Sequence, residues 1–73
     1  MTDEQRKEHI QIVNHAIQVL NKQITNVMYT QARLAGSIAF LMTSDEELIR
    51  NKRQHLDDDY YVAQQIIETD KIK

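Results

Sequence analysis

A single apolar stripe constrains the fold of this chain more than any other feature. Apolar residues recur at alternating steps of three and four from Ile10 to Leu41, and the only polar residue on the stripe is Gln31. This spacing places the side chains on one face of a helix. The apolar members are Ile10, Val13, Ile17, Leu20, Ile24, Val27, Leu34, Ile38 and Leu41. Because the chain contains no proline to interrupt the pattern, the stripe predicts one long helix.

The predicted bounds of this first helix are about 3 and 42. Thr2 and Gln5 have the spacing of a capping box, in which each side chain accepts a hydrogen bond from the other residue's backbone N–H. A helix of this length spans roughly 60 Å. Gly36 and the pair Tyr29 and Thr30 are the positions at which we would expect a kink.

A second capping signal, Ser44 with Glu47, predicts another helix over about 45–70. The apolar stripe of this helix is thinner, and Arg53 occupies one slot on it. Its other members are Ile49, Leu56, Tyr60, Ala63 and Ile67. A break at 57–59, where three aspartates follow one another, is the alternative and would make the fold three-helical.

The two stripes match in the register of an antiparallel hairpin. Facing residues in such a hairpin have numbers that add to a constant, and six candidate pairs share one constant. The pairs are Ile38 with Ile49, Leu34 with Arg53, Gln31 with Leu56, Val27 with Tyr60, Ile24 with Ala63, and Leu20 with Ile67. The bend then falls between Thr43 and Ser44. The sequence therefore predicts an all-α fold, an antiparallel helical hairpin forming a single domain over 1–73.

Apolar residues outside the hairpin contact predict self-association. In this register Ile10, Val13 and Ile17 lie beyond the second helix. A second row on the first helix would let another helix approach closely, and Phe40 would be buried at the same subunit contact. The row consists of Met28, Ala32, Ala35, Ala39 and Met42. A core of this size rarely supplies more than about 3–5 kcal/mol, so we expect a homo-oligomeric bundle, with a four-helix homodimer as the smallest solution.

Composition excludes several classes of function. The chain has no Cys and one Gly, which excludes a disulfide scaffold, a thiolate metal site, a thiol nucleophile and a glycine-rich phosphate loop. The longest apolar run, Ile38 to Met42, is too short to cross a bilayer, and no apolar leader is visible. We therefore expect no membrane partner and a cytoplasmic location. A net charge of −2 gives no general attraction for nucleic acid.

The strongest local charge signal is a basic cluster, which we define as Arg33, Arg50, Lys52, Arg53 and His55. Arg33 is included because the predicted hairpin register places its neighbour Leu34 opposite Arg53. Such a cluster could bind a nucleotide, another anion or an acidic protein surface.

The alternative is a compensated surface, in which Asp57 pairs with Arg53 and Glu46 pairs with Arg50 at i,i+4 spacing. Arg53 would also need an acceptor at its position on the packing stripe, and Gln31 is the candidate. The sequence leaves both interpretations of the basic cluster open.

Two tyrosines complete the candidate binding residues. We expect Tyr60 in the core with its hydroxyl at the edge, and Tyr61 as an interface anchor. His55 and Asp59 could supply two metal ligands, but two ligands do not make a site. The sequence therefore predicts no metal, no cofactor and no catalytic residues.

The stretch Thr30 to Ala35 resembles the opening of a repressor-type helix-turn-helix. This resemblance implies DNA binding by a following recognition helix. The helix that follows begins with three acids, at 45–47, which would be repelled by a phosphate backbone. We therefore do not expect DNA binding by this route.

About a third of the chain resembles the all-helical chorismate mutase family. The matching positions are Ile17, Leu20, Asn21, Ile24, Val27, Met28, Gln31, Leu34, Ala35, Ile38 and Ala39, with Arg53 and Gln54 resembling a later Arg-Glu pair. That family holds a dianionic substrate with cationic side chains, whereas the positions here are Asn14, Gln31 and Met42. A shared heptad produces the same spacing, so we predict no mutase activity.

These observations favour a small non-enzymatic helical interaction protein. We expect a homo-oligomer that binds and modulates another macromolecule, most simply a protein that it inhibits, and that is encoded by a phage or mobile element. The first alternative is an oligomer that binds a small anion such as a nucleotide at its subunit interfaces. A nucleic-acid-binding regulator is the further alternative.

Overall fold

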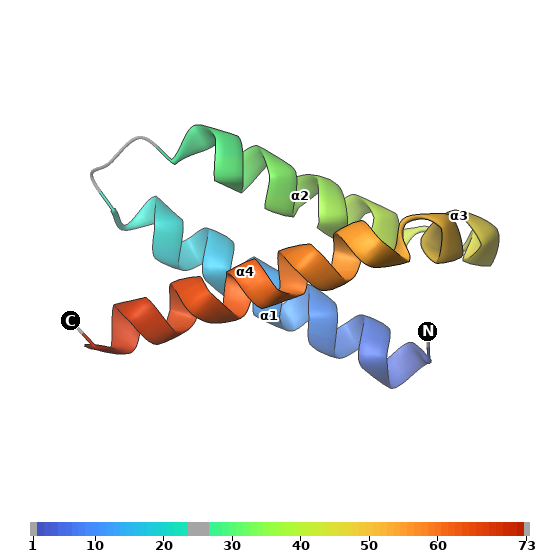
Figure 1. The fold of residues 1–73 in the computed structure, drawn as a ribbon, viewed down its shortest axis with the longest axis horizontal. Helices are drawn as coiled ribbons and strands as arrows, with labels where there is room; N and C mark the ends of the chain where they lie inside the picture. Colours follow the sequence, from blue (N-terminus) through green and yellow to red (C-terminus); the bar gives the residue numbers. More distant parts are fainter. Residues whose placement is uncertain (1, 24–26, 73) are drawn as a thin grey trace.

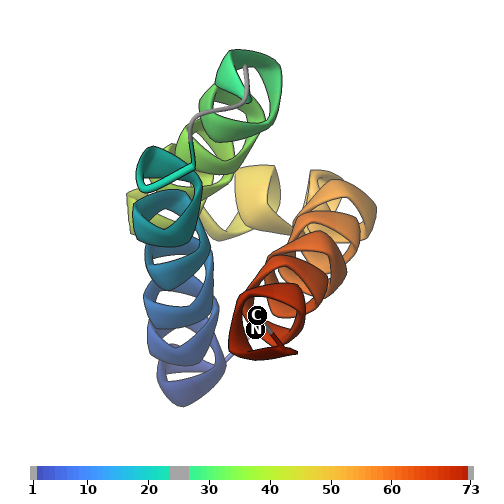
Figure 2. The same cartoon turned by 90° about the vertical axis from the view of Figure 1, so that its left-hand side faces the viewer.

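The computed structural model describes residues 2–23 and 27–72, and these two segments form an all-α fold without a strand. The helices are α1 (Asp3–Asn21), α2 (Met28–Met42), α3 (Glu46–Asn51) and α4 (Arg53–Ile72). In Figure 1, α2 runs antiparallel to α1, and α4 crosses α1 in the same general direction. Seen from one end, the three long helices occupy the corners of a triangle (Figure 2). Across the two described segments, no helix has both the length and the apolar character needed to span a membrane.

The predicted capping box at the start of α1 is confirmed. Thr2 Oγ1 accepts a hydrogen bond from the Gln5 amide at 3.1 Å, and Gln5 Oε1 accepts one from the Thr2 amide at 3.0 Å. Asp3 and Glu4 in the first turn add the negative charge that the helix dipole favours there. The sequence therefore specified where α1 begins.

The prediction of one continuous helix over 3–42 is wrong. The amides of Lys22 and Gln23 bond back three residues, to the carbonyls of Val19 and Leu20, which closes α1 tightly at Asn21. Ile24, a member of the predicted stripe, lies outside the described residues. The sequence 24–27 consists of β-branched residues and Asn, which have low helix propensity. Because α2 runs antiparallel to α1, it packs on α1 and buries apolar side chains that a straight helix would expose. The interruption does not fall at Gly36 or at Tyr29 and Thr30, since α2 is continuous through these positions.

The second predicted helix is present but is divided at Lys52. Lys52 separates α3 from α4 with backbone angles φ −100° and ψ 8°. The alternative break at 57–59 is wrong, because α4 passes through these aspartates without interruption. The helix start also differs by one residue. Asp45, rather than Ser44, is the N-cap of α3, and its Oδ1 accepts from the Leu48 amide at 3.1 Å.

The core consists of two apolar clusters. The larger lies where α1, α2 and α4 meet, and its buried members are Val13, Ala16, Leu20, Leu34, Ala63 and Ile67. The smaller contains Leu41, Ile49 and Leu56, and α3 brings Ile49 to it. Of the ten buried apolar residues in the described segments, all but Ala16 and Val19 belong to the two predicted stripes.

The sequence predicted that the first part of the stripe has no cover within the chain. This prediction is wrong, because α4 covers it. This helix packs more extensively against α1 than against α2. Val13 is only 1% exposed as a result, while Ile17 packs partly buried on the larger cluster and Ile10 on the smaller one. The two-helix register had assigned the second helix to the C-terminal half of the stripe. The chain instead covers both halves itself.

Candidate functional site

The basic cluster predicted from the sequence is divided between two places. Arg33, Lys52 and His55 line one groove between α2 and α4. Arg50 and Arg53 line a smaller hollow of about 190 Å³. The fold therefore does not gather all five basic side chains around one point.

The α2–α4 groove has a volume of about 290 Å³. Its apolar lining comes from both helices and consists of Ala32, Gly36, Phe40 and Leu56. The polar lining consists of Arg33, Ser37, Lys52, His55 and Asp59. Lys52 lies with its Nζ 5.6 Å from the centre of the Phe40 ring, within cation–π distance. An apolar floor with charged groups at its edge is typical of a ligand site.

Asp59 holds the two sides of this groove together. Its side chain is 4% exposed, yet it lies in a run of three aspartates. Arg33 Nε donates to Asp59 Oδ1 at 2.7 Å, and the buried Ser37 hydroxyl donates to Oδ2. We call these three residues the Asp59 clamp. The hydrogen bond and the negative charge of Asp59 raise the pKa of Arg33 above its ordinary value. Arg33 is therefore a structural cation as well as a groove residue.

At the smaller hollow, only one of the two ion pairs predicted for a compensated surface is present. Arg53 Nε donates to both carboxylate oxygens of Asp57 at 3.3 Å, so that predicted pair is confirmed. Glu46 pairs with Arg6 of α1 instead of with Arg50. The predicted contact of Arg53 with Gln31 is also wrong, because Gln31 donates to Asn21. A partly exposed Arg53 reaches a carboxylate on its own helix and needs no acceptor in the core.

Tyr60 connects α4 to α1, as its expected position at the edge of the core allows. Its hydroxyl donates to Glu8 Oε1 at 3.0 Å, and its ring stacks on His9 with the ring centres 4.2 Å apart. Burial, followed by the hydrogen bond to Glu8, raises the pKa of Tyr60 above its ordinary value. His9 donates from Nδ1 to the Gln5 carbonyl at 2.9 Å and lies with Nε2 3.6 Å from Asp57. Tyr60 is thus occupied within the chain and does not line the α2–α4 groove.

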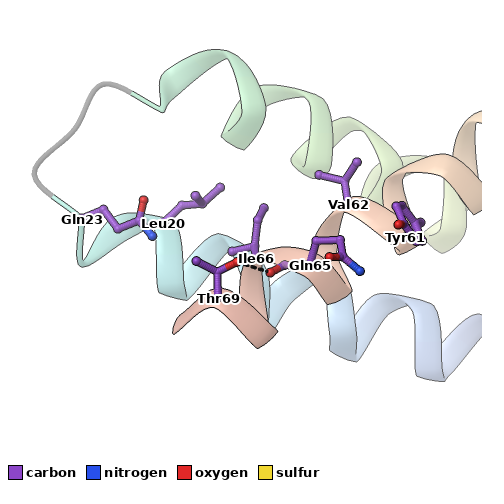
Figure 3. Close-up of a pocket in the computed structure, with 7 residues that line it drawn as sticks. All are labelled: Leu20, Gln23, Tyr61, Val62, Gln65, Ile66 and Thr69. Atoms are coloured by element: carbon purple, nitrogen blue, oxygen red, sulfur yellow. Dashed lines mark hydrogen bonds between the residues drawn. The ribbon is translucent and has the colours of Figure 1, made fainter. Parts of the chain in front are cut away.

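Tyr61 lies on a different surface from Tyr60 and is 63% exposed. It lines an apolar groove of about 270 Å³ between the end of α1 and the second half of α4. Figure 3 shows Val62 and Ile66 projecting from α4 toward the side on which α2 lies. The only hydrogen bond drawn there runs from the Thr69 hydroxyl to the Gln65 carbonyl, at 2.9 Å. No charged side chain lines this groove within the described segments.

The residues predicted for a subunit contact separate into two groups. Val13 is buried inside the chain, and Ile10, Ile17 and Phe40 are partly buried. The other members lie exposed on one side of α2, and with Met42 we call them the outer row. The outer row is Met28, Ala32, Ala35, Ala39 and Met42.

Four residues of the groove are not among the predicted binding or contact residues, and these are Gly36, Ser37, Leu56 and Asp59. A signal for Asp59 was present, because Leu56, Asp59 and Ala63 are spaced by three and four and so share the buried face of α4. Arg33 and Ser37 have i,i+4 spacing on α2, which allows both to reach one carboxylate. In 2–23 and 27–72, no three His, Cys, Asp or Glu side chains are placed to hold a metal ion.

Comparisons with protein-family models, with curated proteins and with solved structures found no match.

Proposed function

We propose that this chain is a helical interaction protein, that its contact surface is the outer face of α2, and that its first partner is a second copy of itself. The observation that carries this proposal is the composition of that face. Of the exposed positions on α2, only Arg33 is charged, and all the others are apolar. Tyr29 and Met42 are 80% and 72% exposed. These two side chains lie at opposite ends of α2, and the exposed alanines between them extend the apolar face along the helix. Contiguous exposed apolar surface marks interaction sites.

The order of side chains along the outer row favours a second copy as the partner. Read in either direction, the row is Met, Ala, Ala, Ala, Met. A twofold contact requires a surface that is complementary to itself. Two antiparallel α2 helices would place Met28 beside the partner's Met42, with Ala35 near the twofold axis. The three alanines would then let the two backbones approach closely where the helices cross.

The size of this face sets the expected strength of the contact. A helix of 15 residues is about 22 Å long, so one helix pair buries less than the roughly 800 Å² per partner of a standard interface. We therefore expect a dimer with a dissociation constant on the order of micromolar or weaker. Binding and modulation of another macromolecule by this dimer remains a prediction from the sequence.

Sedimentation velocity over a series of concentrations tests the proposal. We expect a reversible equilibrium between monomer and dimer for the natural chain. Ala35→Glu places two like charges near the twofold axis and should leave a monomer at every concentration. Gln11→Glu adds the same charge on the exposed face of α1 and should leave the equilibrium unchanged. A natural chain that stays monomeric, or an Ala35→Glu variant that dimerises normally, would overturn the proposal.

A further inference from the structure

The α2–α4 groove has a floor that the fold itself does not explain. Gly36 lies in the middle of α2 with an ordinary helical backbone, and a Cβ atom added there would meet nothing within 4 Å. Glycine in a helix interior costs about 1 kcal/mol relative to alanine. Neither close packing nor a special backbone angle within the chain requires glycine here. Gly36 does keep the groove open and lets another molecule approach the backbone of α2.

The charges at the groove are not fully matched within the chain. The Asp59 carboxylate already receives hydrogen bonds from Arg33 and Ser37, so the charges of Asp59 and Arg33 offset each other. Lys52 and His55 remain at the edge of the groove. In the described segments, neither of these two side chains forms an ion pair. The edge therefore carries the positive charge of Lys52 and the ring nitrogens of His55 as hydrogen-bonding groups.

The position of Phe40 adds an apolar contact below these charges. Its ring is partly buried, lines the groove and lies under the Lys52 ammonium. A flat or aliphatic group could rest on Phe40 and on the open backbone at Gly36 while its charged end meets Lys52. Small pockets bind best when an apolar surface carries the body of a ligand and a few polar groups fix its orientation.

We propose that the α2–α4 groove binds a small organic anion, with its carboxylate or phosphate held by Lys52 and His55 and its apolar body packed over Gly36 and Phe40. The volume of about 290 Å³ limits the ligand to roughly the size of one ring with its anionic group. The site goes beyond the proposed self-association and does not depend on it. The groove and the outer row share only Ala32, and the other α2 residues that line the groove lie outside the outer row.

A titration with phenyl phosphate, followed by NMR, tests the site. The chain contains one glycine, so the Gly36 amide gives an easily assigned signal at the floor of the groove. We expect saturable shifts at Gly36, Phe40 and His55. Benzyl alcohol, which has the ring without the charge, and inorganic phosphate, which has the charge without the ring, should each bind at least fivefold more weakly.

Two variants and a control locate the contact. Gly36→Leu fills the groove with a good helix former and should abolish binding without unfolding the chain, which circular dichroism verifies. Lys52→Met should weaken binding by up to about fivefold, the value of one partly exposed charge pair. Arg50→Met removes a cation that lies outside the groove and should leave binding unchanged.

Several results would overturn the proposal. Equal binding of benzyl alcohol would show that the groove does not select an anion, and equal binding of inorganic phosphate would show that its floor contributes nothing. A Gly36→Leu variant that is folded and binds phenyl phosphate normally would place the ligand elsewhere. The same conclusion would follow if Arg50→Met and Lys52→Met weakened binding to the same extent.

Discussion

The helices α1 and α2 both pack against α4, but their outward faces differ in kind. Every exposed position on α1 is polar or charged, whereas the exposed positions on α2 are apolar except for Arg33. The ends differ as well. A side-chain capping box begins α1, while α2 begins at Val27 without a side-chain cap and has no acid in its first turn. The chain therefore contains one helix, α1, with an ordinary polar solvent-facing surface, and one helix, α2, with a mainly apolar solvent-facing surface.

The two helices also meet α4 in different ways. The contact of α1 with α4 combines apolar packing with polar contacts at its edge, where Tyr60 bonds to Glu8 and stacks on His9. The contact of α2 with α4 is smaller, depends on the Asp59 clamp, and leaves a groove over Gly36.

This difference shows where function is to be sought. The sequence of α1 is explained by the fold of a single chain, since its apolar residues are covered and its polar residues face water. The outer row and Gly36 contribute little to the stability of that single chain. Residues that the fold does not explain are candidates for contacts with other molecules. Both proposals above accordingly concern α2.

The largest expected effect is on stability, and it distinguishes the buried inner face of α2 from the exposed outer row. Leu34 is completely buried in the larger cluster, and Leu34→Ala should lower the free energy of unfolding by about 2–5 kcal/mol. A chain of this size has roughly that much stability in total, so we expect most of the helical circular dichroism at 25 °C to be lost. Met42→Ala, at a 72% exposed position on the same helix, should change stability by less than about 0.5 kcal/mol.

This pair of variants can contradict the comparison between the two faces. The urea titrations should be run at concentrations where the natural chain is monomeric. If Met42→Ala were as destabilising as Leu34→Ala under those conditions, the outer row would be part of the folding core. The distinction between an inner face that supports the fold and an outer face that serves contact would then be wrong.

The second prediction concerns the Asp59 clamp as the polar tie between α2 and α4. Asp59→Ala leaves the buried Ser37 hydroxyl without its acceptor, and an unsatisfied buried polar group costs about 1–3 kcal/mol. We expect a loss of that size in the free energy of unfolding, measured by urea denaturation. Asp58→Ala removes an exposed carboxylate from the neighbouring position and should change stability by less than about 0.5 kcal/mol. Equal losses would show that Asp59 acts only through net charge.

Much of the fold could be predicted because local rules decide it. The capping box at Thr2 depends only on residues of the first turn, and the buried side chains follow the stripes. The break after Asn21 could not be predicted in the same way. Steps of three and four continue across 22–27, and such spacing shows which side chains need cover without showing whether the cover comes from the same chain. A partner helix and a folded-back helix satisfy the stripe equally well.

The candidate site was less predictable than the fold for a related reason. The basic cluster could be recognised from the residue types in the sequence. Only the packing of α2 beside α4 decides that Arg33, Lys52 and His55 share a groove. The sequence placed Asp59 in a run of three aspartates at which the helix could break, and paired it with His55 as a possible metal ligand. Neither pattern predicts its burial, since aspartate is rarely buried without a partner. Its hydrogen-bond partners lie 22 and 26 positions away in the sequence, so no local pattern on α4 indicates them.

The third prediction tests whether α2 is optimised for the stability of the monomer. Gly36→Ala should raise the free energy of unfolding by about 1 kcal/mol, because alanine favours the helix and its Cβ meets no neighbour. Ala35→Gly is the matched control at the adjacent exposed position and should lower stability by a similar amount. Thermal denaturation of both variants measures the difference. A loss of stability in Gly36→Ala would show that the fold does require glycine there.

The smallest expected effect tests the edge contact between α1 and α4. Tyr60→Phe removes the hydrogen bond to Glu8, and we expect it to lower the free energy of unfolding at pH 7 by about 0.5–1 kcal/mol. Because burial raises the pKa of Tyr60 in the folded chain, its stabilising effect is complete below the unfolded pKa of about 10. That effect is lost as the pH rises through the raised pKa of the folded state.

The natural chain should therefore lose more stability than Tyr60→Phe above pH 10, and the difference between the two should shrink in urea titrations across that range. Tyr61→Phe, at a position that is 63% exposed, should match the natural chain at pH 7. A constant difference between the natural chain and Tyr60→Phe at all pH values would contradict the role of the hydroxyl group. The Tyr60 hydroxyl would then add no free energy to the contact between α1 and α4, and that contact would depend on apolar and ring packing and on the approach of His9 to Asp57.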